Sequence, residues 1–116
     1  MQCRRFGKGA MSQSEILEKL FAVIRSRQAD RPEGSYVVQL LDGGIESIGA
    51  KVLEEAQEVV DAARGGESRP LSEEVADLLF HLWVLMADVG IAPEAVYAVL
   101  NDRFGLGGLV EKASRE

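Results

Sequence analysis

The chain has little of several residue types, and each scarcity excludes a class of protein. Its 116 residues include one cysteine, Cys3, which rules out an internal disulfide and favours a reducing, cytoplasmic compartment. One cysteine and one histidine are too few ligands for a zinc site. No apolar run reaches the roughly 18 residues of a membrane-spanning helix. Residues 1–10 also lack the apolar stretch of a signal peptide, so we expect neither export nor a membrane partner.

Basic residues are outnumbered by acidic ones. Thirteen Lys and Arg residues against nineteen Asp and Glu residues give a formal net charge of −6. This balance argues against a nucleic-acid partner, because phosphate binding needs clustered Lys and Arg. The length suits one domain with one core. We expect residues 1–11 to be a disordered N-terminal extension, since Met11 opens a more ordinary start, and residues 12–116 to form the single domain.

Apolar residues recur at helical spacing over most of the chain and predict an all-α fold with four main helices. The expected helices are residues 12–28, 45–63, 72–89 and 93–104. Ser12 with Glu15 has the spacing of a capping box, and Ser72 is the expected N-cap of the third helix. Gly43-Gly44 is expected to break the chain. Residues 37–41 are treated as irregular, because no second strand-like run exists to pair with them.

The third predicted helix is apolar on nearly all sides. Its apolar residues are Val75, Leu78, Leu79, Phe80, Leu82, Trp83, Leu85, Met86 and Val89. Such a helix lies at the centre of its protein or in an oligomer interface. Because the domain is small, we expect a homodimer or a higher homo-oligomer that completes the helical bundle.

Two acidic clusters stand on the second and third predicted helices. They read Glu54-Glu55-x-x-Glu58 and Glu74-x-x-Asp77. Carboxylates three or four residues apart lie on the same side of a helix. At about 100° per residue, Glu55 falls beside the buried apolar stripe, Glu58 at its border and Glu54 nearer to solvent. A carboxylate aligned with core residues is costly unless it is paired or bound to a metal.

These acids have the chemistry of a magnesium site. Mg²⁺ takes oxygen ligands and usually combines carboxylates, waters and substrate phosphates. Glu55, Glu58, Glu74 and Asp77 are the expected ligands, and the phosphates of a nucleotide would complete the coordination. Glu54 and Glu55 are the candidate catalytic residues, with Glu54 placed to orient a water for attack or to bind a second ion.

Several polar residues are candidates for binding the substrate. Gly34-Ser35-Tyr36 offers backbone N–H groups and two hydroxyls to a phosphate or a ribose. Lys51 precedes the first acidic cluster by one turn, where it could form a salt bridge or contact a phosphate. His81 shares the side of the third helix that carries Glu74, and a hydrogen-bonded core residue is its more common role than a metal ligand.

The acidic motif resembles that of the MazG-type all-α nucleotide pyrophosphohydrolases, and within them the phosphoribosyl-ATP pyrophosphohydrolase family of histidine biosynthesis. The segment from Pro32 to Tyr36, the Lys51-Val52 lead-in and the tail from Glu111 to Arg115 are also similar to that family. The resemblance covers about Ile16 to Arg115.

That resemblance implies Mg²⁺-dependent hydrolysis of the α–β phosphoanhydride of phosphoribosyl-ATP to phosphoribosyl-AMP and pyrophosphate. It places the metal on the four expected carboxylates and the substrate near Ser35, Tyr36, Lys112 and Arg115. The family pattern differs at four positions, where this chain has Val37, Gln39, Leu53 and Gly107. These differences affect the substrate side and not the acids.

Two other functions remain open from the sequence. One is a housekeeping pyrophosphohydrolase that acts on free nucleoside triphosphates. The other is a non-catalytic helical module whose acids bind a cation or serve an interaction.

Overall fold

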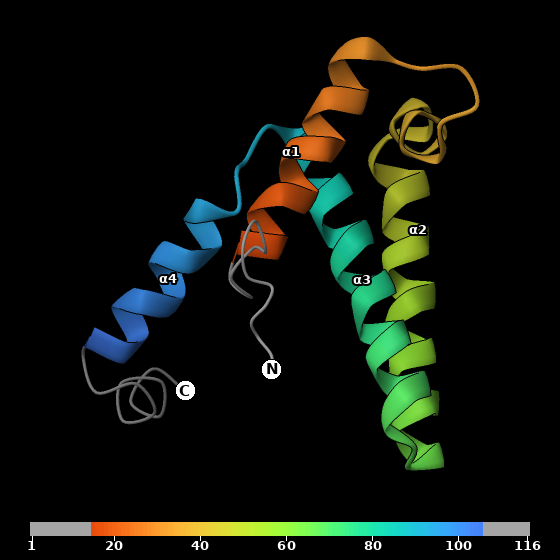
Figure 1. The fold of residues 1–116 in the computed structure, drawn as a ribbon, viewed down its shortest axis with the longest axis vertical. Coiled ribbons are helices and arrows are strands. Elements are labelled where there is room, and N and C mark those ends of the chain that lie inside the picture. The colour runs from red at the N-terminus through yellow and green to blue at the C-terminus, as the bar shows by residue number, and fades with distance from the viewer. Residues whose placement is uncertain (1–14, 106–116) are drawn as a thin grey trace, which may run out of the picture.

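The described residues, 15–105 of a computed structural model, form four helices and no strand (Figure 1). The helices are α1 (Glu15–Asp30), α2 (Tyr36–Gly65), α3 (Ser68–Val89) and α4 (Glu94–Gly105). The prediction of an all-α fold is therefore confirmed. The predictions for residues 1–11, Ser12, Gly107, Lys112 and Arg115 lie outside the described residues.

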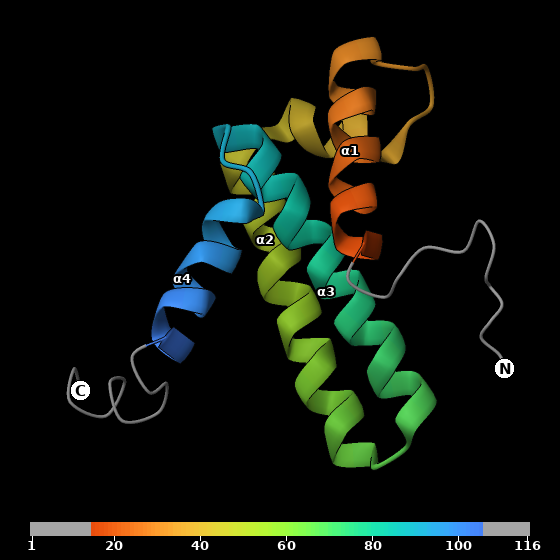
Figure 2. The same cartoon turned by 60° about the vertical axis from the view of Figure 1, so that its left-hand side comes forward.

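The antiparallel pair of α2 and α3 forms the frame of the molecule (Figure 2). α1 packs against the half of this pair that is remote from the α2–α3 turn. Gly66 ends α2 in the left-handed conformation, at a φ of 80°, and its N–H donates to the carbonyl of Ala63 at 3.1 Å. Glycine adopts this conformation without a Cβ clash, and α2 ends at Gly65, two residues beyond the predicted end at Ala63.

The prediction that residues 37–41 are irregular is wrong, because α2 already begins at Tyr36. Ser35 caps this helix: its Oγ accepts a hydrogen bond from the backbone N–H of Val38 at 3.3 Å. Val37 and Leu40 bury their side chains in the core. Capping and burial together make a helix of a segment too short to show a clear period.

The predicted break at Gly43-Gly44 is present inside α2. Gly44 has φ 71° and ψ −168°, which is not helical and is a region that residues with a Cβ rarely occupy. The break turns residues 36–43 across the bundle, and residues 45–65 then run along α3 (Figures 1 and 2). The kink thus places the start of α2 beside the middle of α3.

The prediction that Ser72 caps the third helix is also wrong, because α3 begins at Ser68 with Glu67 at the N-cap. Pro70 stands in the first turn of α3. Proline is tolerated there, because the first backbone N–H groups of a helix have no partner within it. The helix therefore starts one turn earlier than its best capping residue suggests.

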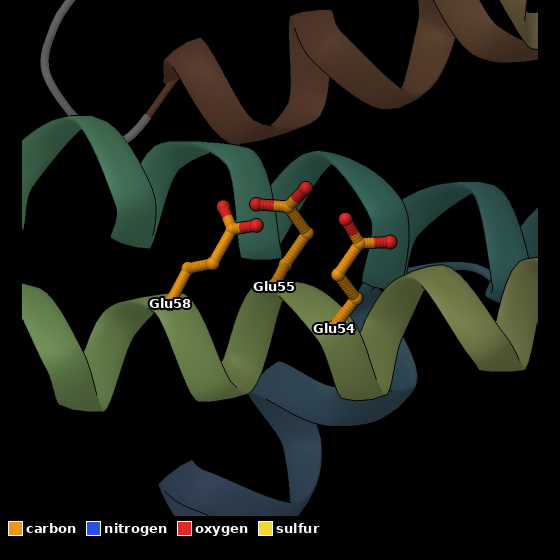
Figure 3. A group of neighbouring side chains, drawn as sticks. All are labelled: Glu54, Glu55 and Glu58. Atoms are coloured by element: carbon orange, nitrogen blue, oxygen red, sulfur yellow. The ribbon is translucent and has the colours of Figure 1, made fainter.

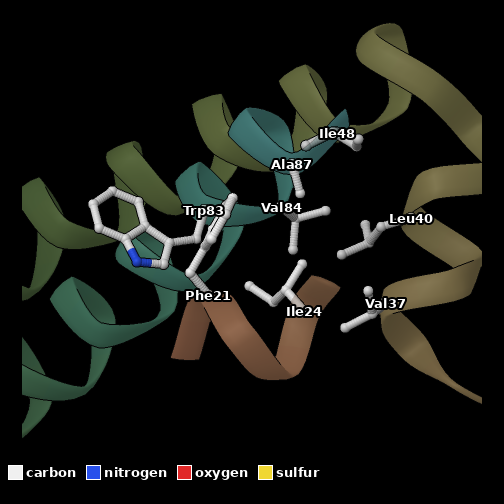
Figure 4. Close-up of a cluster of buried hydrophobic side chains, with 8 residues drawn as sticks. All are labelled: Phe21, Ile24, Val37, Leu40, Ile48, Trp83, Val84 and Ala87. Atoms are coloured by element: carbon white, nitrogen blue, oxygen red, sulfur yellow. The ribbon is translucent and has the colours of Figure 1, made fainter. Parts of the chain in front are cut away.

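The core gathers side chains from α1, both parts of α2, and α3 (Figure 4). Its buried apolar members are Phe21, Ile24, Val37, Leu40, Ile48, Trp83, Val84 and Ala87. Trp83 also donates its indole N–H to the carbonyl of Leu17 at 2.9 Å, which joins α1 to α3. Because α1, α2 and α3 bury side chains in one common core, this core fixes the positions of α2 and α3, the helices that carry the acidic residues.

α4 leads away from the bundle (Figures 1 and 2). Several of its apolar side chains are exposed. Val99, Leu100 and Phe104 are exposed, while Tyr97 packs against the core. Among residues 15–105, no single helix is long and apolar enough to cross a membrane. α3 and α4 meet those criteria only as a pair, and they are bent by 111°.

Candidate active site

The first acidic cluster lies on the side of α2 that faces α3 (Figure 3). Glu54, Glu55 and Glu58 each offer a carboxylate oxygen, and these three atoms lie within 4.8 Å of one another. Glu55 is buried, with 7% of its surface exposed, whereas Glu54 is exposed and Glu58 is half-buried. This order agrees with the prediction from helical spacing.

α3 contributes the second acidic cluster. Oxygens of Glu74 and Asp77 lie within 4.8 Å of each other and of an oxygen of Glu55. Glu55 therefore belongs to both groups and joins the acids of α2 to those of α3. The structure brings the predicted carboxylates into one site, which we call the carboxylate site: Glu54, Glu55, Glu58, Glu74 and Asp77.

Two oxygens of the carboxylate site are buried and lack hydrogen-bond partners among the described residues. They are Oε1 of Glu55 and Oε1 of Glu74. A buried, unpaired carboxylate oxygen costs free energy, and neighbouring negative charges add repulsion. A hard divalent cation removes both costs, and a donor set made only of carboxylate oxygens fits Mg²⁺. The residues present therefore suit the expected metal.

The crowding of the acids changes the pKa of Glu74. A hydrogen bond with Glu58 is the largest cause, followed by desolvation and by repulsion from Glu58, Asp77 and Glu55. Together they raise this pKa from 4.5 to about 7. The metal-free carboxylate site thus retains a proton near neutrality.

This shift predicts that the metal-free protein loses thermal stability as pH rises from about 4.5 to about 7. In that window the folded state holds the Glu74 proton and the unfolded state has released it, so raising the pH favours unfolding. Calorimetry of chelator-treated protein measures the effect. Glu74→Gln is expected to flatten the dependence. An equally steep fall in that variant would contradict the assignment.

Lys51 forms ion pairs with the carboxylate site. Its Nζ lies 3.2 Å from Oε1 of Glu54 and 3.8 Å from Oε2 of Glu55. The hydrogen bond to Glu54 is the main reason why the pKa of Lys51 is raised. Of the two roles expected for Lys51, the salt bridge is the one present in the structure.

Of the substrate-side residues at the start of α2, Tyr36 is linked to the carboxylate site through His81, and Ser35 is not. Ser35 uses its Oγ to cap α2, and the Tyr36 hydroxyl lies 2.9 Å from Nε2 of His81. The His81 ring is buried, and its Nδ1 lies 2.8 Å from the carbonyl oxygen of Asp77. His81 is therefore a hydrogen-bonded core residue, as its more common role predicted. The hydrogen bond between His81 and Tyr36 was not predicted from the sequence. The sequence did indicate that His81 lies on the same side of its helix as Glu74, and therefore near the acidic residues.

Comparison with known proteins finds one family over most of the chain. The family model described as Phosphoribosyl-ATP pyrophosphohydrolase matches residues 17–104. A phosphoribosyl-ATP pyrophosphatase of Trichlorobacter lovleyi is 47% identical over 105 residues, which cover 90% of this chain and 97% of the relative. One from Rhodopirellula baltica is 47% identical over 103 residues, which cover 85% of each chain.

A third relative is longer than this chain. The histidine biosynthesis bifunctional protein HisIE of Deinococcus radiodurans is 46% identical over 93 residues. The matched region covers 80% of this chain and 43% of that protein. Most of this chain thus corresponds to one part of a larger protein in that relative.

Proposed function

Because the chain belongs to the phosphoribosyl-ATP pyrophosphohydrolase family, we propose that it hydrolyses phosphoribosyl-ATP at its α–β phosphoanhydride. The products would be phosphoribosyl-AMP and pyrophosphate, in the second step of histidine biosynthesis. The main structural support is Glu55, a buried carboxylate that both acidic groups share and whose Oε1 has no described partner. A histidine-biosynthesis role is consistent with the name of the bifunctional relative. We also propose a cytoplasmic location.

Mg²⁺ is the proposed cofactor, and Glu55, Glu58, Glu74 and Asp77 are its proposed ligands. Glu55 and Glu74 each have a buried oxygen without a hydrogen-bond partner among residues 15–105. Glu58 on α2 and Asp77 on α3 each have a carboxylate oxygen within 4.8 Å of one of Glu55. Bound there, the ion would neutralise charge on the phosphate oxygens as the phosphoanhydride breaks. Glu54 stands at the exposed margin of the site, where a second ion or a water can approach it.

The remaining steps use side chains of the protein. Glu54 would orient the attacking water and accept its proton. The water oxygen would bond to phosphorus while the phosphorus–oxygen bond to the leaving phosphate group breaks. Lys51, held by Glu54 and Glu55 in the structure, would turn to a substrate phosphate once the acids are neutralised. Ser35 and Tyr36, at the start of α2, would contact the substrate. Lys112 and Arg115 remain proposed substrate contacts.

A substrate panel tests this function against the housekeeping alternative. Pyrophosphate release would be measured with phosphoribosyl-ATP and with each free nucleoside triphosphate, in the presence of Mg²⁺. We expect kcat/KM for phosphoribosyl-ATP to exceed the values for free triphosphates by at least about 100-fold. Free triphosphates lack the phosphoribosyl group, and loss of its polar contacts with the protein costs several kcal/mol. Preference for free triphosphates would instead support the housekeeping activity.

We also propose that the chain forms a homodimer through its exposed apolar surface. One groove of about 480 Å³ runs along α2 and reaches Leu85, and a second of about 390 Å³ lies between α3 and α4 beside Met86. The first contains Leu53, of which 74% is exposed. Mass measured by light scattering should be that of two chains, and Leu53→Glu should lower it. A monomeric wild-type protein would refute this assembly.

A further inference from the structure

His81 has a fixed hydrogen-bonding arrangement. Its Nδ1 lies 2.8 Å from the carbonyl oxygen of Asp77. A carbonyl oxygen can only accept, so Nδ1 must carry the hydrogen of this bond. In a neutral ring the other nitrogen is then an acceptor. Because Nε2 lies 2.9 Å from the Tyr36 hydroxyl, the tyrosine O–H donates to His81.

Ring packing holds this pair in place. Phe80 stacks on Tyr36, with ring centroids 6.0 Å apart and 16° between the planes. The same phenyl ring meets His81 edge to face at 5.1 Å. His81 is only 5% exposed, while Tyr36 is 45% exposed. The histidine is thus a buried support, and the tyrosine is the part that a ligand can reach.

The direction of the hydrogen bond determines what the tyrosine can recognise. Its proton is committed to His81, so the oxygen presents lone pairs to a ligand and can only accept. Phosphate oxygens of a nucleotide are acceptors as well and gain nothing from such a group. The donors of a nucleotide are its ribose hydroxyls and the amino group of its base. The Tyr36 oxygen therefore matches the nucleoside part of a substrate.

We propose that His81 is a positioning residue that holds Tyr36 as a hydrogen-bond acceptor for the nucleoside part of the substrate. The pair lies beside the acidic residues, because Asp77 supplies both a carboxylate to the site and the carbonyl that orients His81. This role rests on the proposed function, and it assigns Tyr36 to nucleoside recognition instead of phosphate binding.

Nitrogen-15 NMR tests the hydrogen-bond direction without any activity measurement. The protein contains one histidine, so in a tag-free chain every imidazole signal belongs to His81. At mildly alkaline pH we expect a protonated Nδ1 and an unprotonated Nε2, and Tyr36→Phe should shift the Nε2 resonance. A ring protonated at Nε2, or an Nε2 signal that Tyr36→Phe leaves unchanged, would overturn the proposal.

Kinetics of two matched variants tests the positioning role. In His81→Gln the amide can still accept from Tyr36, whereas the shorter side chain of His81→Asn reaches only the Asp77 carbonyl. We expect His81→Asn and Tyr36→Phe each to raise KM about tenfold with kcat little changed, and His81→Gln to stay within about threefold of wild type. Thermal melts would verify that all variants are folded.

The double variant separates positioning from a merely structural role. If His81 acts through Tyr36, adding His81→Asn to Tyr36→Phe should change KM by less than about twofold. Losses that add up, or equal losses for the Gln and Asn variants, would overturn the proposal. Either result would leave the pyrophosphohydrolase function standing. A wild-type protein without turnover would defeat that function and the positioning role together.

Discussion

Replacing Glu55 by glutamine is expected to lower kcat/KM for phosphoribosyl-ATP roughly 100- to 1,000-fold, because several kcal/mol of metal-derived charge stabilisation would be lost. Glu55 joins the two acidic groups, and no other carboxylate of residues 15–105 belongs to both. The amide has nearly the same shape as the acid and removes a buried charge. The melting temperature of the metal-free variant should therefore be equal to or above that of wild type.

Two further substitutions make this prediction specific. Asp77→Asn removes a charge from the α3 side of the carboxylate site and should cause a loss of similar size. Glu73→Gln is the matched control, because Glu73 is exposed, adjoins Glu74 and pairs with Arg69 at 2.8 Å. Its effect should be less than about twofold. Unchanged turnover in both Glu55→Gln and Asp77→Asn would favour the non-catalytic module.

Replacing Gly44 by alanine is expected to lower the free energy of unfolding by about 1–3 kcal/mol. Gly44 has φ 71° and ψ −168°, and a Cβ there would meet no atom within 4 Å. The cost therefore comes from the backbone alone. Because this kink places Tyr36 against His81, substrate binding should also weaken. Urea unfolding would measure this change in the free energy of unfolding, and the m-value should be the same in the variant and in wild type.

Gly49→Ala is the control for the kink. Gly49 lies in the same helix, has no positive φ, and a Cβ there would also meet nothing within 4 Å. Alanine should stabilise this position by about 0.4–1 kcal/mol, since it restricts the unfolded chain. The two variants should thus change stability in opposite directions. A stabilising Gly44→Ala would show that the kink is not required by the fold.

The sequence was sufficient to predict that the acidic residues lie together. It was only partly sufficient to predict the helices around them. Helical spacing places Glu55 beside buried apolar residues whatever the neighbouring elements do, and it is buried in the structure. The helix at residues 37–41 was missed, because it depends on the Ser35 cap and on burial of Val37 and Leu40 in a core formed by distant elements. Local pattern cannot report such tertiary support.

The hydrogen bond between Tyr36 and His81 is likewise a tertiary contact that the local sequence pattern does not predict. The two residues are 45 positions apart, and their contact depends on the angle at Gly44. The sequence shows that a break occurs there but not the direction in which the chain turns. The start of α3 was misplaced for a local reason: Ser72 is a good cap, yet Pro70 fits the first turn just as well.

Anomalous diffraction from crystals grown with Mn²⁺, which shares the oxygen preference of Mg²⁺, tests the metal assignment most directly. The account predicts an anomalous peak between α2 and α3, at coordination distance from carboxylate oxygens of Glu55, Glu58, Glu74 and Asp77. Crystals of Glu55→Gln under the same conditions should lose it. A peak elsewhere on the protein, or a peak of equal height in that variant, would contradict the assignment of this carboxylate site as the metal centre.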